Sequence, residues 1–574
     1  ALGRGAAIAC VAGAFGFGVV VLGDLAHTDS GVVFFIGALA GAVVGLSPRS
    51  DPRFEALGAL LVGLLVSVAG VGTGFGWLEL SALAGSALAA VWVLAGEWRP
   101  KDPWRWFRWG GAVLFVLTLV LLPMILDGGT LGHDESAYGV KARQWLEGTP
   151  GSGWSPHRGT GMSAYGYLVL ALGGQEAGLR LLGLVGALGL AAGSWALGRR
   201  MANPRVGAIA SVAVVAGPAV LRRSTEYLSD VPTAALLVFC MVIIWSEFND
   251  RQAPSYRLLW VLPLAWGAFY LRYQSALSLA LIAMVVGWLW WPKVRRRPGP
   301  VVWVVVLGLL GLIPHFVQSI DLTGRPWGIL LNTSSGAVRA YVGEGLLDYA
   351  GQIGWHIGGY VGPIALVAAL VGLITTWRSP ETRNRYLFLL VPALVQVLGL
   401  GLISHGEPRF ILFPLALVVV AGVMAIDGWI SERGSAWPHA LAWAACVLLV
   451  GSLALSAADA RESVDSRAAN NEPVELAALD VMDRAGGEAC GVLTSYTPQI
   501  TFYSRCASEI FETGKGPEEH LEQLRGEDRF MVLIENGKRQ PIGPELQGFV
   551  DLTSGSPAVV VGTKRDAVVY TFEG

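Results

Sequence analysis

Long apolar runs alternate with short polar loops from the start of the chain to about residue 457. A transmembrane helix needs about 20 predominantly apolar residues, and these runs approach that length. The pattern therefore predicts about fifteen membrane spans. We interpret the first run as a span rather than a signal peptide because further spans follow. The expected spans lie near 5–23, 32–47, 56–72, 79–96, 110–126, 177–198, 205–221, 231–247, 257–271, 274–291, 300–316, 354–376, 386–404, 409–427 and 438–457.

The pattern changes in the C-terminal part of the chain. Expected helical runs at 472–485 and 516–525 alternate there with short β-like runs, CGVLTS, RFMVLIE, AVVVGT and AVVYTF. This alternation is typical of a small α/β domain, which we place at 458–574. The rest divides into an extra N-terminal transmembrane module, 1–109, and a membrane domain, 110–457.

The distribution of basic residues predicts the orientation in the membrane. The segments GEWRPKDPWRWFR, LGRRMANPR, EFNDRQAPSYR, PKVRRRPG and WRSPETRNR fall on one side when the expected spans are alternated. Short cytoplasmic loops carry an excess of Lys and Arg, so this side is cytoplasmic. The C-terminal domain and two long loops, 127–176 and 317–353, are then expected outside the cell membrane.

The composition agrees with an all-α polytopic membrane domain that carries a small α/β domain. Hydrophobic residues make up 53% of the chain and charged residues only 15%, whereas a soluble domain carries about 25% charged residues. The formal net charge of −2 argues against nucleic acid as a partner. Membrane lipids are the expected surroundings.

Two of the five cysteines, Cys490 and Cys506, lie in the polar C-terminal domain. A domain on the oxidising side can form a disulfide, which we expect here, with two unpaired thiols as the alternative. Cys10, Cys240 and Cys446 lie in apolar runs and are expected to pack as small hydrophobic residues.

Charged and polar side chains gather where the expected spans reach the outside. Charges near membrane depth are costly, and arginines on this side run against the cytoplasmic bias, so their placement points to a function. A carboxylate can deprotonate a hydroxyl, and arginines can bind a phosphate through paired hydrogen bonds. The set comprises His133, Asp134, Glu135, Tyr138, Lys141, Arg158, Arg222, Arg223, Glu226, Asp230, Arg272, His405, Glu407 and Arg409.

Each group also has a purely structural interpretation. Loop carboxylates can be solvated, arginines can extend to lipid headgroups, and an acidic residue before a proline can cap a helix. The first alternative applies to Asp134 and Glu135, the second to Arg222 and Arg223, and the third to Asp230. In addition, Glu407 and Arg409 can form a local ion pair, and His405 can be structural.

At these residues the chain resembles the GT-C glycosyltransferases, above all the protein O-mannosyltransferases and the bacterial aminoarabinose transferases. Residues 134–138 read Asp-Glu-Ser-Ala-Tyr, as in the D-E-x-x-Y motif of the first outside loop in that family. Residues 228–230 (Leu-Ser-Asp), residues 405–410 (His-Gly-Glu-Pro-Arg-Phe) and the stretch SYTPQITFYS resemble further family segments. The resemblance extends from about Ala112 to the C-terminus.

The resemblance implies an inverting transfer of a sugar from a polyprenyl-phosphate carrier to a hydroxyl of a glycan, lipid or protein. Asp134 would be the base, and Glu135 would orient the site or bind the acceptor. Arg222, Arg223 and Arg272 would hold the carrier phosphate. A divalent metal is compatible with the family but not required, and we find no metal-ligand spacing in the sequence.

One departure concerns the donor sugar. The aminoarabinose transferases carry a lysine in a Glu-Lys-Pro-Pro segment, but the corresponding stretch here, HRGTGMSAYGYL, has Arg158 as its nearest basic residue. Aminoarabinose itself is therefore not the expected sugar. The main functional alternative is a transporter or lipid flippase, although these place charges at mid-span and are often built from inverted repeats. A non-catalytic scaffold is a further alternative.

Overall fold

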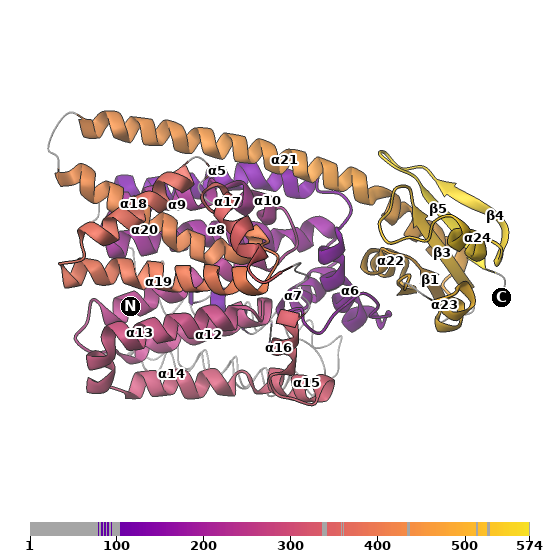
Figure 1. Cartoon of the computed structure of the whole chain (residues 1–574), viewed down its shortest axis with the longest axis horizontal. Coiled ribbons are helices and arrows are strands. Elements are labelled where there is room, and N and C mark those ends of the chain that lie inside the picture. The colour runs from indigo at the N-terminus through magenta and orange to yellow at the C-terminus, as the bar shows by residue number, and fades with distance from the viewer. Residues whose placement is uncertain are drawn as a thin grey trace.

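The computed structural model describes residues 104–335, 341–356, 359, 361–432, 437–512, 515–524 and 528–572, and a few positions between 79 and 93. The expected spans near 5–23, 32–47 and 56–72, and thus most of the N-terminal module, lie outside the described residues. A helical bundle forms one part of the molecule and a smaller α/β domain lies at one end of it (Figure 1).

Within the bundle, α8 and α11 pack closely against each other. The elements of the bundle are α5 (Trp104–Leu126), α6 (His133–Glu147), α7 (Thr160–Ala171), α8 (Glu176–Met201), α9 (Pro204–Val215), α10 (Pro218–Ser224), α11 (Asp230–Phe248), η1 (Tyr256–Trp260), α12 (Val261–Leu271), α13 (Ser275–Arg296), α14 (Gly299–Leu310), α15 (Ile313–Thr323), α16 (Gly328–Ser335), α17 (Glu344–His356), α18 (Val361–Thr375), α19 (Pro380–Ile403), η2 (Pro408–Ile411) and α20 (Leu412–Glu432).

Six helices in the described part of the chain are long and apolar enough to cross a membrane, or up to seven if a bent pair counts as one span. The chain is therefore a multi-pass membrane protein. The bent pair is α9 and α10, which meet at 70° where the sequence predicted one span over 205–221. Pro218 opens α10, and a proline cannot continue the hydrogen bonding of a preceding helix.

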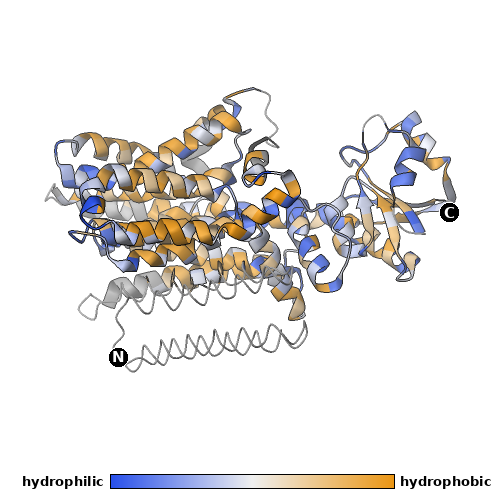
Figure 2. Ribbon diagram, turned by 90° about the horizontal axis from the view of Figure 1, so that it is seen from below, coloured by the Kyte–Doolittle hydropathy of each residue, from blue (hydrophilic) through white to orange (hydrophobic). Residues whose placement is uncertain are grey.

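α11 lies in the middle of the bundle, because 89% of the residues in its most apolar 18-residue stretch are buried. In the span formed by α14 and α15, only 17% of the corresponding residues are buried. A helix that is apolar all round fits either the core or a lipid-facing position. Figure 2 shows that hydrophobic residues predominate along the helices of the bundle, whereas the terminal domain contains more hydrophilic residues.

One long helix, α21 (Trp437–Ala485), connects the bundle to the terminal domain without a break (Figure 1). The sequence predicted two separate helical segments here, 438–457 and 472–485. The polar stretch between them lacks apolar periodicity, but it contains several Ala and Arg residues, which favour helix. The Arg461–Asp465 ion pair, at 3.1 Å and four residues apart, supports this segment.

The terminal domain contains a five-stranded sheet in the order β2-β1-β3-β5-β4, which confirms the small α/β domain. β1 is parallel to β2 and β3, and β5 is antiparallel to β3 and β4. One face of the sheet packs against α21 and α22, and the other against α24. The elements are β1 (Cys490–Leu493), α22 (Thr497–Ser504), β2 (Ala507–Glu509), α23 (Pro517–Gln523), β3 (Asp528–Ile534), α24 (Pro544–Val550), β4 (Thr553–Val560) and β5 (Ala567–Phe572).

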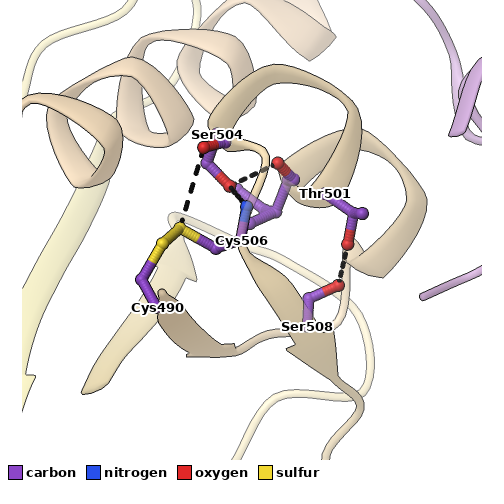
Figure 3. The surroundings of a disulfide bond; sticks show 6 residues. Cys490, Thr501, Ser504, Cys506 and Ser508 are labelled. Atoms are coloured by element: carbon purple, nitrogen blue, oxygen red, sulfur yellow. Dashed lines mark hydrogen bonds between the residues drawn. A yellow bond between two sulfur atoms is a disulfide. The ribbon is translucent and has the colours of Figure 1, made fainter. Parts of the chain in front are cut away.

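A disulfide joins Cys490 to Cys506 and confirms the predicted pairing (Figure 3). Cys490 opens β1 and Cys506 follows α22, so the bond ties the C-terminal end of α22 to the sheet. Ser504 accepts a hydrogen bond from the Cys506 amide at 3.1 Å. Cys240 is buried and free, as expected, while Cys10 and the Cys446 side chain lie outside the described part.

Replacing both bonded cysteines by serine is expected to destabilise the terminal domain. The disulfide closes a loop with a sequence separation of 16, for which chain entropy accounts for about 3 kcal/mol. Thermal unfolding of Cys490→Ser/Cys506→Ser should therefore begin below that of the native protein. An unchanged unfolding profile, or two freely alkylatable thiols in native protein, would contradict this expectation.

Candidate active site

Asp134 lies in the first turn of α6, where the bundle meets the terminal domain. Gly132 precedes the helix in an extended conformation. Nη2 of Arg158, from the loop after α6, donates to Oδ1 of Asp134 at 2.8 Å. Nη1 of Arg409, from η2, donates to Oδ2 at 2.8 Å. Two guanidinium groups that are far apart in the sequence thus hold one carboxylate.

These contacts keep Asp134 ionised. Burial raises the pKa of its carboxyl group, but the charges and hydrogen bonds of Arg158 and Arg409 outweigh burial and hold the pKa well below its usual range. The side chain is 33% exposed, so a ligand can still reach it.

A second carboxylate–arginine pair lies beside the first. Asp230 is the first residue of α11, with Ser229 as the helix cap, so the interpretation of Asp230 as the cap itself is wrong. Its carboxylate pairs with Nη1 of Arg272, which follows α12. Two other guanidinium nitrogens of Arg272 donate to Oε1 of Gln274 at 2.8 and 3.1 Å.

These groups line a cavity of about 180 Å³ at one end of the bundle. Three guanidinium groups and two carboxylates face it together with aromatic side chains, so it suits an anionic ligand that also carries hydroxyl groups. The lining residues are Asp134, Tyr138, His157, Arg158, Gly159, Leu228, Ser229, Asp230, Arg272, Tyr273, Gln274, Arg409 and Phe410.

Glu135 differs from its neighbour because it is buried and does not line this cavity. Its carboxylate accepts hydrogen bonds from Nε of Arg180 at 2.8 Å, from the Gly132 amide at 2.7 Å and from the Tyr227 amide at 2.8 Å. Burial raises its pKa, but Arg180 and Arg467 lower it to about 2. Glu135 therefore joins α6, α8 and the loop before α11.

The other predicted residues fall into two groups. Tyr138 lines the cavity. Glu407 lies next to the cavity because it forms an ion pair with Arg409, which lines it, and Glu407 also contacts His405 at 3.2 Å. The remainder do not line it: Arg223 pairs with Glu226 at 2.6 Å, Lys141 binds Gln144 at 2.8 Å, and His133 and Arg222 are exposed. Of the arginines named from the sequence, Arg158, Arg272 and Arg409 line the cavity, whereas Arg222 and Arg223 do not.

Sequence reasoning missed Arg180 and Arg467. Arg180 lies near the start of α8, at the end that the sequence predicts to be outside, and an arginine on that side runs against the cytoplasmic bias, which is the signal that identified the other arginines. Arg467 lies in the polar stretch of α21 and contacts Glu226 at 2.7 Å. The residues around Arg467 in the sequence carry no comparable signal. Arg467 comes close to the site only because α21 runs past it in the folded protein.

Within the described ranges, no three His, Cys, Asp or Glu side chains are grouped so that they could hold a metal ion. Asp134 and Asp230, the carboxylates of the cavity, are instead paired with arginines. This donor set does not fit a metal centre.

No family profile and no curated protein matches the sequence, but solved structures are similar to it. ArnT from Cupriavidus metallidurans, bound to undecaprenyl phosphate, is 15% identical with a TM-score of 0.56, and the match covers 81% of this chain and 98% of that one. Its apo structure gives 13% identity and the same TM-score, covering 80% and 97%. AglB from Archaeoglobus fulgidus, in complex with an inhibitory peptide and a dolichol-phosphate, reaches a TM-score of 0.46 at 11% identity, covering 74% and 69%.

Proposed function

Because the chain has the fold of the GT-C glycosyltransferases, we propose that it transfers a sugar from a polyprenyl-phosphate carrier to an acceptor hydroxyl with inversion. The observation that carries the proposal is the position of Asp134 between Arg158 and Arg409 at the cavity. A carboxylate beside several arginines matches a reaction that needs a proton acceptor and a phosphate-binding group.

The proposed reaction is a single displacement. The acceptor oxygen attacks the anomeric carbon while the bond from that carbon to the phosphate oxygen breaks. The polyprenyl phosphate leaves with the bonding electron pair, and the acceptor proton passes to Asp134. Arg158, Arg272 and Arg409 stabilise the negative charge that grows on the phosphate. Attack from the face opposite the leaving group inverts the anomeric carbon.

The ion pairs of Asp134 couple donor binding to its basicity. A carboxylate held by two guanidinium groups is a weak base. When the donor phosphate binds, Arg158 and Arg409 divide their hydrogen bonds between the phosphate and Asp134. The pKa of Asp134 then rises from its depressed value, so the base is activated only when the donor is present.

The reaction would take place on the extracytoplasmic side of the cell membrane. The basic loops support this orientation. The Cys490–Cys506 disulfide also supports it, because disulfides persist in oxidising compartments. The donor sugar is open, and the acceptor is a hydroxyl of a glycan, lipid or protein.

Arg158→Ala is expected to weaken donor binding by about 10- to 100-fold, since a hydrogen bond to a charged group contributes about 1.5–3 kcal/mol. Arg158→Lys should restore only part of the affinity because lysine lacks the planar fork. Arg222→Ala is the matched control, as Arg222 is exposed and does not line the cavity. Titration with a polyprenyl-phosphate sugar measures the effect. Equal weakening in Arg158→Ala and Arg222→Ala would overturn the assignment.

The activity itself can be tested with purified protein in lipid nanodiscs and a panel of polyprenyl-phosphate sugars. We expect at least one donor to release polyprenyl phosphate when an acceptor hydroxyl is supplied. If no donor in the panel is cleaved, while intact donor crosses the bilayer of proteoliposomes, the protein is a flippase and the transferase proposal is wrong.

A further inference from the structure

A short helix of the terminal domain, α22, packs directly against α6, the helix that begins beside Asp134 (Figure 1). Its far end is tied to the sheet by the Cys490–Cys506 disulfide (Figure 3). All eight residues of α22 are buried. The helix is therefore held firmly in the terminal domain while one side of it contacts α6.

The backbone turn that leads into α6 takes both of its contacts at Leu131 from α22. The Leu131 amide donates to the hydroxyl of Tyr503 at 2.9 Å, and the Leu131 carbonyl accepts from Nε2 of Gln499 at 3.5 Å. Arg180 binds the carbonyls of Gly129 and Thr130 at 2.7 and 3.1 Å. These bonds to the Leu131 amide and to the carbonyls of residues 129–131 favour one position of the turn, and Asp134 follows Leu131 by three residues.

Close packing reinforces these hydrogen bonds. Gly139 faces the ring of Phe502, and a Cβ at this position would lie only 2.7 Å from that ring. The guanidinium carbon of Arg143 lies 4.2 Å from the centre of the same ring. Arg505, which follows α22, pairs with Glu147 at the end of α6 at 3.0 Å. α22 and the residue after it thus contact α6 from its middle to its C-terminal end.

The same helix also contacts the loop that carries Arg158. Gly153 has φ +84°, and a Cβ there would lie 2.7 Å from Pro498 at the start of α22. Any larger residue would therefore be strained and would push the loop away from α22. Arg158 follows Gly153 by five residues and donates to Asp134. One helix of the terminal domain is packed against both segments that supply the Asp134–Arg158 pair.

We propose that α22 positions the catalytic carboxylate and that Tyr503 is the main positioning residue, through its hydrogen bond to the Leu131 amide. The proposal rests on the proposed function of Asp134. Tyr503 does not line the cavity and so does not touch the substrate. The terminal domain then serves to hold the base at the correct distance from the donor, for which displacements of about 1 Å can cost about 10²-fold in rate.

Tyr503→Phe tests the proposal because it removes one hydroxyl and preserves the packing of the ring. We expect kcat for sugar transfer to fall about tenfold with the KM for the donor changed by less than about twofold, the pattern of a contact that matters only in the transition state. Tyr570→Phe is the matched control. It removes a hydroxyl from β5 in the same domain, where Tyr570 packs on the face of the sheet opposite α22.

Hydrogen exchange provides a readout that does not depend on activity. In Tyr503→Phe, amides in the segment 128–140 should exchange faster, while those of 528–572 stay protected. Unchanged kcat and exchange in Tyr503→Phe, or an equal loss of kcat in Tyr570→Phe, would overturn the positioning role. If wild-type protein cleaves no donor, the proposed function fails, and exchange in 128–140 alone then decides whether Tyr503 holds the turn.

Discussion

Asp134→Asn should lower sugar transfer by about 10²–10⁴-fold, the usual contribution of a general base. Asparagine keeps the size of aspartate, and its one amide oxygen can still accept a hydrogen bond from Arg158 or Arg409, but its NH2 group cannot accept from the other arginine, and the side chain cannot take up the acceptor proton. Thermal stability should change little because the side chain is partly exposed. Donor affinity should be equal or higher, since the two guanidinium groups no longer divide their charge with a carboxylate.

Released polyprenyl phosphate and donor titration, measured on the same preparation, check both parts of this expectation. In the wild-type protein, kcat/KM reports the free enzyme, in which the pKa of Asp134 is depressed. It should therefore show no acidic limb from this group above about pH 4. Near-normal transfer by Asp134→Asn would move the base elsewhere, and Asp230, the other carboxylate of the cavity, would be the next residue to test.

Arg180→Met should destabilise the protein by about 3–5 kcal/mol, because breaking a buried ion pair leaves an uncompensated charge. Arg180 is fully buried and Glu135 is 3% exposed. The substitution also leaves the carbonyls of Gly129 and Thr130 without their donor. A marked fall in the temperature of thermal unfolding is the expected result.

The double variant Arg180→Met/Glu135→Gln serves as the control for this effect. Glutamine removes the unpaired buried charge and can still accept from the Gly132 or Tyr227 amide, so part of the lost stability should return. If Arg180→Met unfolds at the wild-type temperature, the pair does not hold the start of α6. The two variants thus distinguish the neighbouring carboxylates Asp134 and Glu135. Asp134→Asn should affect sugar transfer, whereas Arg180→Met, which removes the partner of Glu135, should affect stability.

Much of the architecture follows from the sequence. Apolar runs long enough to cross a bilayer imply helices, because every backbone polar group in lipid must be bound within the segment. The change of periodicity in the C-terminal part predicted the α/β domain, and its two cysteines predicted the disulfide that is present. Breaks within apolar runs were harder to predict, as α9 and α10 show, because composition alone does not reveal a 70° bend.

The ends of the spans that we expect to be outside were also identified from the sequence as the place where charges meet. Asp134, Asp230 and Arg272 were named there and line one cavity. Their location follows from the cost of charge at membrane depth, which a linear sequence displays directly. That Arg409 is near Glu407 was likewise foreseen, since two residues across a turn are close in any fold.

Only the tertiary structure decided which charges pair. Asp134 and Glu135 are adjacent and chemically alike, yet side chains at successive helix positions point in different directions, so one faces the cavity and the other the buried Arg180. Arg409 reaches Asp134 across 275 residues of sequence. Tyr503 reaches Leu131 across 372. Such contacts depend on how helices pack and where α21 carries the terminal domain, and hydrophobic periodicity specifies which residues form helices but not which distant side chains those helices bring together.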